Sequence, residues 1–315
     1  MGKKGRRPGK NIGGCSSNQK KGPGKARRER AVAAREIEER TQALASRLEE
    51  ELHDVDIFAP LEPLEDCPIC FVPMGSRGDE CLTMPCCCKH VCGSCLAISD
   101  SSNGGSGKRG VTICPLCRTE IDREETRREK FERLKQRAEA NDTEAMEFLA
   151  DMCRETGEGV QKDEIEELRN YLKAAELESL TAICEVAECC IKGVGIDKNE
   201  KLAMQLAVSA AKKGSRTAHY IIGFNLLRKL KGMQMMSNDD DRGAAVDHFM
   251  HGAKGGDFEC MGSLRYLNGI RTPDGNGLFS DDDFLEIDRQ YQAAKGARWS
   301  EEREAFLKRP AEFWK

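Results

Sequence analysis

Ten of the sixteen cysteines lie between Cys67 and Cys117, and their spacing is typical of metal ligands. The stretch LTMPCCCKHVCGSC, residues 82–95, places five cysteines and one histidine within ten consecutive positions. Three Cys-x-x-Cys pairs occur, and they begin at Cys67, Cys92 and Cys114. Two residues between thiolates allow a tight turn to direct both sulfurs at one tetrahedral ion, which favours zinc.

Disulfide and redox chemistry explain these cysteines less well. The N-terminus is basic but has no apolar segment of the kind that a secretory signal needs, so we expect a reducing compartment, the cytoplasm or the nucleus. No βαβ pattern surrounds any of the pairs, as a redox motif would require. No apolar run approaches the ~20 residues of a membrane-spanning helix, so no membrane association is expected.

The spacing resembles that of the RING finger, in which two zinc ions are bound in a cross-brace. Fifteen residues separate the first pair from the central cluster, and eighteen separate the cluster from the last pair. In the RING pattern the first and third ligand pairs share one ion, and the second and fourth pairs share the other. The resemblance assigns site one to Cys67, Cys70, Cys92 and Cys95, and half of site two to Cys114 and Cys117.

The other half of site two departs from the commonest RING form, which would put a histidine at position 89. The chain has Lys89 there, a cation that cannot ligate at neutral pH, and His90 comes one place late. An all-cysteine RING subclass has two adjacent ligating cysteines after a proline, which matches Pro85-Cys86-Cys87. We therefore expect Cys86 and Cys87 as ligands. Cys88 or His90 is the alternative, and Cys81 lies outside the register.

All eight ligand positions are filled by protein, so no coordination site is open to a water. Two zinc ions with a structural role, not a hydrolytic one, are therefore expected. The resemblance implies a ubiquitin ligase without a nucleophile of its own, which docks a ubiquitin-loaded conjugating enzyme. Ile69 and Pro115 match the family's contacts for that enzyme, and Arg118 matches its "linchpin" arginine. The tryptophan that many such ligases carry between the third and fourth pairs is missing.

Charge and apolar pattern divide the rest of the chain. Residues 1–28 carry ten Lys or Arg and no acid, and they have too few apolar side chains to fold alone. We expect a disordered basic arm, with nucleic-acid binding through phosphates as one possible use. The remaining boundaries follow from apolar stripes, prolines and the cysteines: an amphipathic helix over 29–58, a zinc finger over 64–119, a connecting helix over 120–140, helical repeats over 141–300 and a tail over 301–315.

The repeats are indicated by segments of similar sequence that recur at a spacing of 36 residues. GEGVQKD, residues 157–163, aligns with GVGIDKN, residues 193–199, and Ala174-Ala175 aligns with Ala210-Ala211. AKGGDFEC, residues 253–260, continues the series after a shift of 42. Such periods indicate stacked helix pairs. The motifs resemble Sel-1-like repeats, relatives of the tetratricopeptide repeat, through Gly157, Gly159, Val160, Asp163, Gly193, Gly195, Ala210, Ala211, Gly214, Ala218 and Gly223.

The expected protein is thus mainly α-helical, with a small cross-brace zinc domain followed by a helical solenoid. The leading functional hypothesis is a RING-type ubiquitin ligase whose repeats recruit substrate or partner proteins on a concave surface. A non-catalytic zinc-binding adaptor is the competing hypothesis. A nucleic-acid-associated factor that uses the basic arm is the third.

Overall fold

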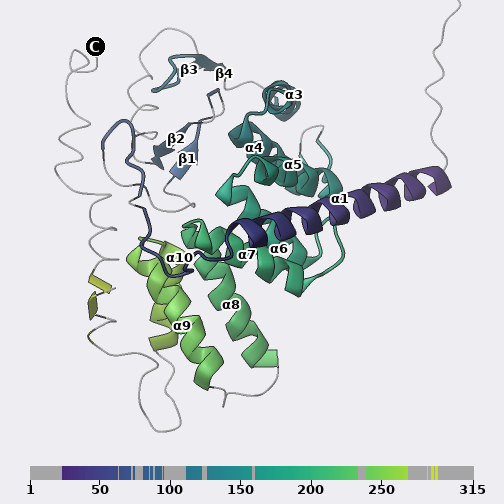
Figure 1. Cartoon of the computed structure of the whole chain (residues 1–315). Helices are drawn as coiled ribbons and strands as arrows, with labels where there is room; N and C mark the ends of the chain where they lie inside the picture. Colours follow the sequence, from purple (N-terminus) through teal and green to yellow (C-terminus); the bar gives the residue numbers. More distant parts are fainter. Residues whose placement is uncertain are drawn as a thin grey trace, which may run out of the picture.

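A computed structural model describes residues 23–62, 64–71, 74, 81–84, 86–87, 89–93, 95, 111–122, 126–157, 160–232 and 239–268, with five positions between 282 and 289. The protein is mainly α-helical (Figure 1). The basic arm up to residue 22, residues 290–300 of the expected repeat region and the tail over 301–315 lie outside the described residues. None of the helices in the described part is long and apolar enough to cross a membrane.

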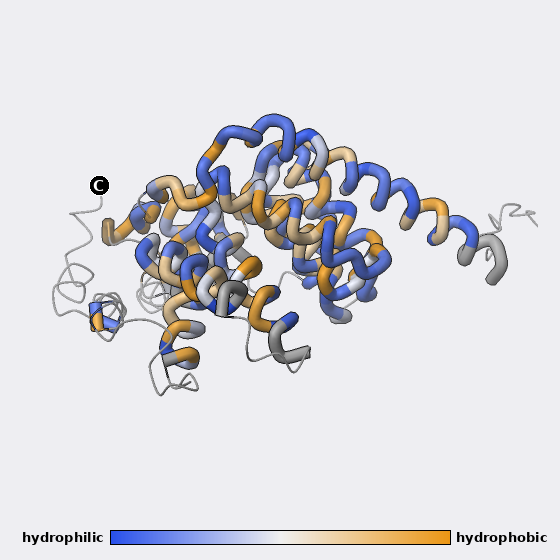
Figure 2. The backbone as a smooth tube through the Cα atoms, turned by 60° about the horizontal axis from the view of Figure 1, so that its bottom comes forward, coloured by the Kyte–Doolittle hydropathy of each residue, from blue (hydrophilic) through white to orange (hydrophobic). Residues whose placement is uncertain are grey.

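The repeat array, residues 143–268, consists of antiparallel helix pairs. Helices α4 (Thr143–Arg154) and α5 (Glu164–Glu176) form the first pair and α6 (Leu180–Lys192) and α7 (Glu200–Lys212) the second. Helices α8 (Arg216–Gly232) and α9 (Asp239–Lys254) form the third, and α10 (Phe258–Asn268) follows. The first helices of the units, α4, α6, α8 and α10, begin 37, 36 and 42 residues apart, close to the spacings seen in the sequence. Many alanines are buried in the array, and Figure 2 shows hydrophobic and hydrophilic residues alternating along its helical turns.

The same turn precedes α4, α6, α8 and α10, the first helix of each unit. Its first residue has a left-handed backbone, with φ of 62° at Asn141, 68° at Glu178, 90° at Gly214 and 91° at Gly256. The next residue caps the following helix through a side-chain oxygen that accepts a backbone N–H, and these caps are Asp142, Ser179, Ser215 and Asp257. Such caps satisfy a helix donor that has no partner within the helix. The connections of the array are therefore locally encoded.

A network around Arg154 joins α4, α5 and α6. Its guanidinium donates to Glu167 at 2.8 Å, to the Tyr171 hydroxyl at 2.9 Å and to Glu185 at 2.7 Å. The Glu167 and Tyr171 side chains are almost wholly buried, so the network gives partners to the Tyr171 hydroxyl and to one carboxylate oxygen of Glu167, whereas the other, Oε2, has no hydrogen-bond partner. The network fixes the stacking of the first repeat on the second.

The N-terminal helix α1 (Pro23–Glu51) packs along α5 and α7, the second helices of the first two repeats (Figure 1). Its buried side chains Ile37, Leu44 and Leu48 join the main core of the array. Arg40 reinforces the contact with an ion pair of 2.6 Å to Glu176. The apolar face of α1 therefore packs against the repeat array.

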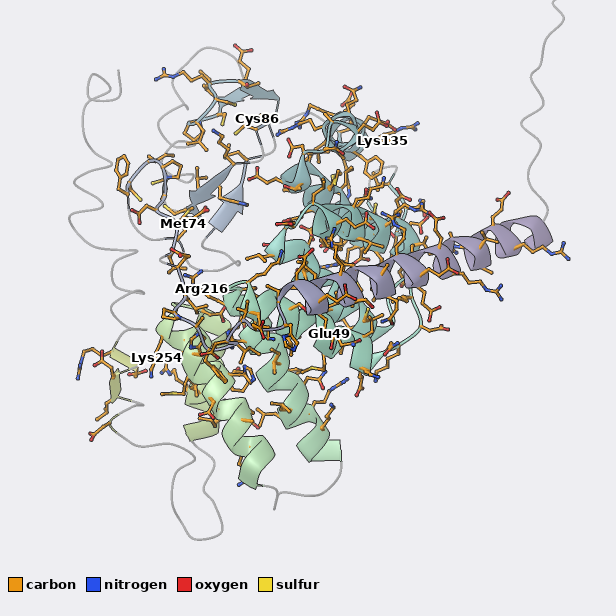
Figure 3. The ribbon with its side chains drawn as sticks, in the orientation of Figure 1. Glu49, Met74, Cys86, Lys135, Arg216 and Lys254 are labelled. Carbon is orange, nitrogen blue, oxygen red and sulfur yellow. The ribbon has the colours of Figure 1, made fainter. Side chains whose placement is uncertain are left out.

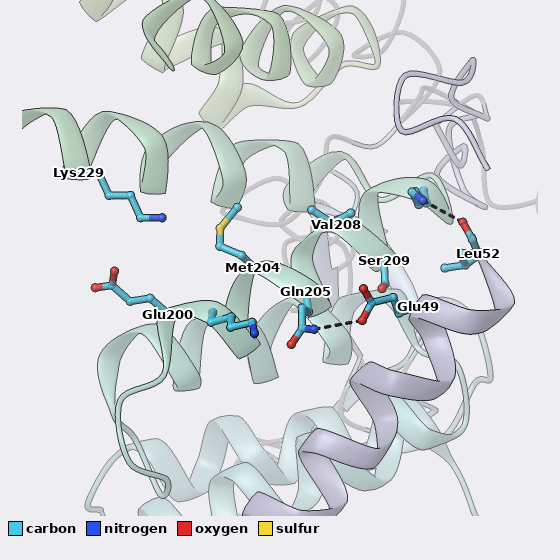
Figure 4. A pocket seen from close by; sticks show the side chains of 10 residues that line it. Glu49, Leu52, Glu200, Met204, Gln205, Val208, Ser209 and Lys229 are labelled. Atoms are coloured by element: carbon cyan, nitrogen blue, oxygen red, sulfur yellow. Dashed lines mark hydrogen bonds between the residues drawn. The ribbon is translucent and has the colours of Figure 1, made fainter. Parts of the chain in front are cut away.

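Helix α1 differs in its bounds from the helix expected over 29–58. It begins at Pro23, since proline suits the first helical position, where its missing N–H would have no partner. It ends at Glu51, well before the prolines, because Lys212 bonds the carbonyl of Leu52 at 2.9 Å and that of His53 at 3.5 Å, which favours the end there. Beside this contact a groove of about 520 Å³ lies between α1, α7 and α8, and Glu49 accepts from Gln205 at its edge (Figure 4).

The cysteine module, residues 64–122, contains two small antiparallel hairpins. Strands β1 (Cys81–Thr83) and β2 (His90–Cys92) form the first, with Cys81 opposite Cys92. Strands β3 (Val111–Ile113) and β4 (Glu120–Asp122) form the second. The connecting helix expected over 120–140 is therefore shorter, because residues 120–122 pair as a strand. Helix α3 (Arg127–Glu139) begins after a capping box at Thr126 and Glu129.

Candidate metal centre

Site one is built from the knuckle at Cys67–Phe71 and the end of the first hairpin. The Phe71 N–H donates to the Cys67 carbonyl at 2.8 Å, and this turn brings Cys67 and Cys70 to one side. The Cys92 N–H reaches the Cys67 sulfur at 3.5 Å, and the sulfurs of Cys70 and Cys92 are 3.8 Å apart. With Cys95, the four sulfurs lie within 4.8 Å of one another. The site is mostly buried.

Site two repeats the same local structure with a second knuckle, Cys114–Arg118. The Arg118 N–H donates to the Cys114 carbonyl at 3.0 Å, and Arg118 has a φ of 59°, close to the 57° of Phe71. Cys86 and Cys87 complete the group, at 3.4 Å from the Cys117 sulfur and 3.9 Å from the Cys114 sulfur respectively. Cys117 is exposed, so this site lies nearer the surface.

The structure brings the eight cysteines together in the cross-brace order: first pair with third, second pair with fourth. Cys88 lies outside the described residues. His90 is half-buried in β2, and it joins neither group of four sulfurs, so the histidine alternative finds no support in this geometry. The ligand roles themselves stay a prediction.

The donor set fits zinc. A tetrahedral ion with Zn–S bonds of about 2.3 Å separates its sulfurs by about 3.8 Å. The three sulfur pairs given above span 3.4 to 3.9 Å. Burial, followed by the neighbouring thiols Cys114 and Cys117, raises the pKa of Cys86, and burial is also the main cause that raises the pKa of Cys87. A divalent cation at the centre would relieve that penalty and hold the thiolates.

The three residues that match conjugating-enzyme contacts lie on the two knuckles. Ile69 is half-buried and packs against the small cores at both sites, whereas Pro115 is half-buried at the second knuckle. The Arg118 side chain is exposed directly after the last cysteine of site two. The geometry places these side chains beside the metal groups, and their roles stay predictions.

Arg137 of α3 makes a contact with site two that the sequence did not reveal. Its guanidinium donates to the carbonyl of Cys86 at 2.9 Å and to that of Cys87 at 3.2 Å. The same side chain pairs with Asp142, the cap of α4, through its Nε at 3.0 Å. In the sequence Arg137 is one of many charged residues in REETRREKFERLKQRAE, and nothing there separates it from its neighbours.

A second junction holds the segment between α1 and the module against α8 and α9. Phe58 packs on the rings of His219, His248 and His251, at 4.9 to 5.8 Å between centroids. The Nδ1 atoms of His219 and His248 are 3.0 Å apart, and burial lowers the pKa of His219 to about 3 and that of His248 to about 4. Neutral imidazoles therefore line this junction. The three rings do not converge as a metal site among the described residues.

A cleft of about 540 Å³ separates the cysteine module from the N-terminal ends of α4, α6 and α8. Met74 and His90 face it from the module, and Glu144 and Glu147 face it from α4. Burial raises the pKa of Glu144, an effect that His90 partly opposes. Arg216 of α8 lies at its edge and bonds the Glu62 carbonyl (Figure 3). The module thus lies against the first helices of successive repeats.

Comparison with known proteins decides the nature of these repeats. Residues 143–179 and 180–215 match the Sel1 repeat family. The array contains Sel1 repeats. The match begins and ends at the turns described above, and the third helix pair continues the array beyond it. It does not extend to the cysteine module, and no curated protein matches the chain.

Two solved structures are similar in fold. A Sel1 repeat protein from Oxalobacter formigenes is 22% identical, with a TM-score of 0.43, over 56% of this chain and 66% of that one. A protective antigen of uropathogenic Escherichia coli strains, which displays an SLR fold, is 20% identical, with a TM-score of 0.39, over 52% of this chain and 32% of that one. The matched part therefore spans about two thirds of the first protein and one third of the second.

Proposed function

We propose that the protein is a RING-type ubiquitin ligase that docks a ubiquitin-loaded conjugating enzyme on its cysteine module and recruits a protein partner on its Sel1 repeats. The observation that carries the proposal is the grouping of eight cysteines into two sets of four in cross-brace order. Sel1 repeats supply the second half, because stacked helix pairs offer an extended surface for partner proteins.

Ile69 and Pro115 would contact the conjugating enzyme, because each lies within a knuckle whose shape a bound metal would fix. Arg118 would bridge that enzyme and ubiquitin with its planar fork of five donors. The module would contribute no nucleophile. It would accelerate transfer by holding the loaded enzyme in its reactive arrangement, which is catalysis by positioning.

A single-turnover discharge assay beside a binding titration tests these roles. Ile69→Ala should weaken binding of the conjugating enzyme by ~1–3 kcal/mol, because it removes apolar contact area. Arg118→Ala and Arg118→Lys should slow discharge while binding of the unloaded enzyme stays nearly constant. Arg128→Ala, an exposed arginine on α3, is the matched control and should change neither.

All four variants should keep two zinc ions, since none of the residues is a ligand. Wild-type protein that stimulates no conjugating enzyme across a broad panel would contradict the ligase. Equal discharge by wild type and Arg118→Ala would contradict the role of the arginine.

The second candidate is a non-catalytic adaptor in which zinc stabilises a scaffold and the repeats do the binding. It is favoured by the missing tryptophan between the third and fourth pairs and by a family match confined to the repeats. In that case Ile69→Ala and Arg118→Ala would leave binding of a protein partner to the repeats unchanged. The nucleic-acid hypothesis is tested by deleting residues 1–22, which leaves α1 whole, and measuring salt-dependent RNA and DNA binding.

A further inference from the structure

The contact between Arg137 and site two joins parts of the chain that are far apart in sequence. Arg137 lies 51 residues after Cys86 and 50 after Cys87, and it reaches both of their carbonyls with one guanidinium. The side chain is about a quarter exposed. Figure 3 shows Cys86 beside α3, on which Lys135 is labelled. This is a bidentate contact to the backbone of two predicted ligands.

This contact has an electrostatic role at site two. Four thiolates around one zinc ion carry a net charge of −2, and a guanidinium next to the ligand backbone offsets part of it. Outer contacts of this kind also orient the ligating side chains, and their loss commonly weakens metal binding 10- to 100-fold. Cys86 and Cys87 need such support because they follow each other directly and have no knuckle of their own.

The other end of the Arg137 guanidinium is fixed to the repeat array. Nε donates to Asp142 at 3.0 Å, and the other carboxylate oxygen of Asp142 caps α4 by accepting the Ala145 N–H at 3.0 Å. The array therefore holds Arg137 in the orientation that meets site two. The bonds described above for site one, in contrast, come from within the module itself.

We propose that Arg137 is a positioning residue for the metal at site two, through which metal occupancy is coupled to the docking of the cysteine module on the first Sel1 repeat. The proposal rests on the zinc centre of the proposed function, and not on ligase activity. Since linkage is reciprocal, zinc at site two stabilises the docked array, and the docked array strengthens zinc binding at site two.

The test is a zinc titration of the full chain in competition with a chromophoric chelator. In Arg137→Ala one of the two ions should bind about tenfold more weakly or worse, and the other should be unaffected. Arg137→Lys should recover part of the loss, because it keeps the charge without the fork. Arg128→Ala on the same helix should match wild type.

A Cys114→Ser background identifies the affected ion. That protein should hold one zinc ion, at site one, and adding Arg137→Ala should leave its affinity unchanged. The reciprocal readout is thermal: zinc should raise the melting temperature of the helical signal more in wild type than in Arg137→Ala.

The possible outcomes distinguish a failure of this inference from a failure of the proposed metal centre. Unchanged affinities in Arg137→Ala, with normal helical content, would overturn this inference alone, and so would an equal loss at both sites. Wild-type protein that binds no zinc would overturn the metal centre and this inference with it.

Discussion

Cysteine is abundant in both the cysteine module and the repeat array, and the two regions use it in opposite ways. In the module eight thiols face one another in two groups, partly open to solvent at site two. In the array the cysteines are buried among mainly apolar side chains, and these are Cys153, Cys184, Cys189, Cys190 and Cys260. Spacing and surroundings, not residue type, separate a ligand from a small hydrophobe.

Core size explains the difference. Among its described residues the module has only small clusters around Met74 and Met84, too little apolar area to hold its loops. The array has two larger core clusters, of which the main one is rich in alanine and leucine. Burial there raises the pKa of Cys190 and, first among several causes, that of Cys153, each to about 12. Those thiols stay protonated and apolar in character.

Removing one thiol from each region should give the largest contrast. Cys87→Ser should release one of two zinc ions, because serine is a poor zinc ligand and a structural site contributes an apparent ~10–16 kcal/mol. Cys190→Ser should keep both ions and only lower the stability of the array. Metal analysis of reduced protein measures the first, and thermal melting the second.

His90→Ala is the control for the ligand register, and it should keep both ions. Loss of zinc in His90→Ala together with full zinc in Cys86→Ser would show that site two is assembled in another register.

Two glycines of the array test how much of its stability depends on close packing. The cysteine module, in contrast, is expected to depend on metal. Gly195→Ala should cost roughly 3 kcal/mol or more, because φ is +69° and the new Cβ would lie 2.2 Å from the Glu164 carbonyl oxygen. Gly214→Ala has a φ of +90° but open space, so only about 1 kcal/mol of backbone strain is expected. Denaturant unfolding measures both, and equal losses would refute the role of packing.

Alkaline pH should weaken the array through its buried thiols. Their pKa is raised above the unfolded value near 9, so their contribution is fully present below pH 9 and is lost as pH rises towards 12. The slope is about 1 kcal/mol per pH unit for each thiol. Cys153→Ala with Cys190→Ala should flatten that part of the curve against wild type. An identical slope in both proteins would contradict this account.

The smallest expected effect on stability comes from a non-glycine residue with a left-handed backbone conformation. Glu178 occupies the turn position that Gly214 and Gly256 hold in later repeats, with φ of 68°. Glu178→Gly should stabilise the array by about 0.5 kcal/mol, since relief of backbone strain exceeds the added entropy of the unfolded chain. Glu178→Ala keeps the strain and should bring no gain.

The sequence predicted the features that are encoded locally. Helix pairs follow from the 36-residue spacing, and the two cysteine groups follow from three Cys-x-x-Cys pairs taken together with the resemblance to the RING finger. Left-handed Glu178 could also have been found, because the spacing aligns it with Gly214. The surface on which α1 packs could not have been identified from the sequence, since Ile37 and Leu44 fit any apolar surface. Arg137 and the histidines around Phe58 belong to contacts between distant segments, for which no local pattern exists.

Helix α1 has a consequence for how the array folds. An array of repeats in which each contacts only its neighbours can nucleate anywhere and unfold in parts. By packing on both α5 and α7, α1 ties two repeats to a segment more than a hundred residues earlier. Forming that contact closes a long loop, which slows folding but makes the first two repeats open together. Hydrogen exchange should therefore show one cooperative unit under α1, and a third helix pair that opens more readily.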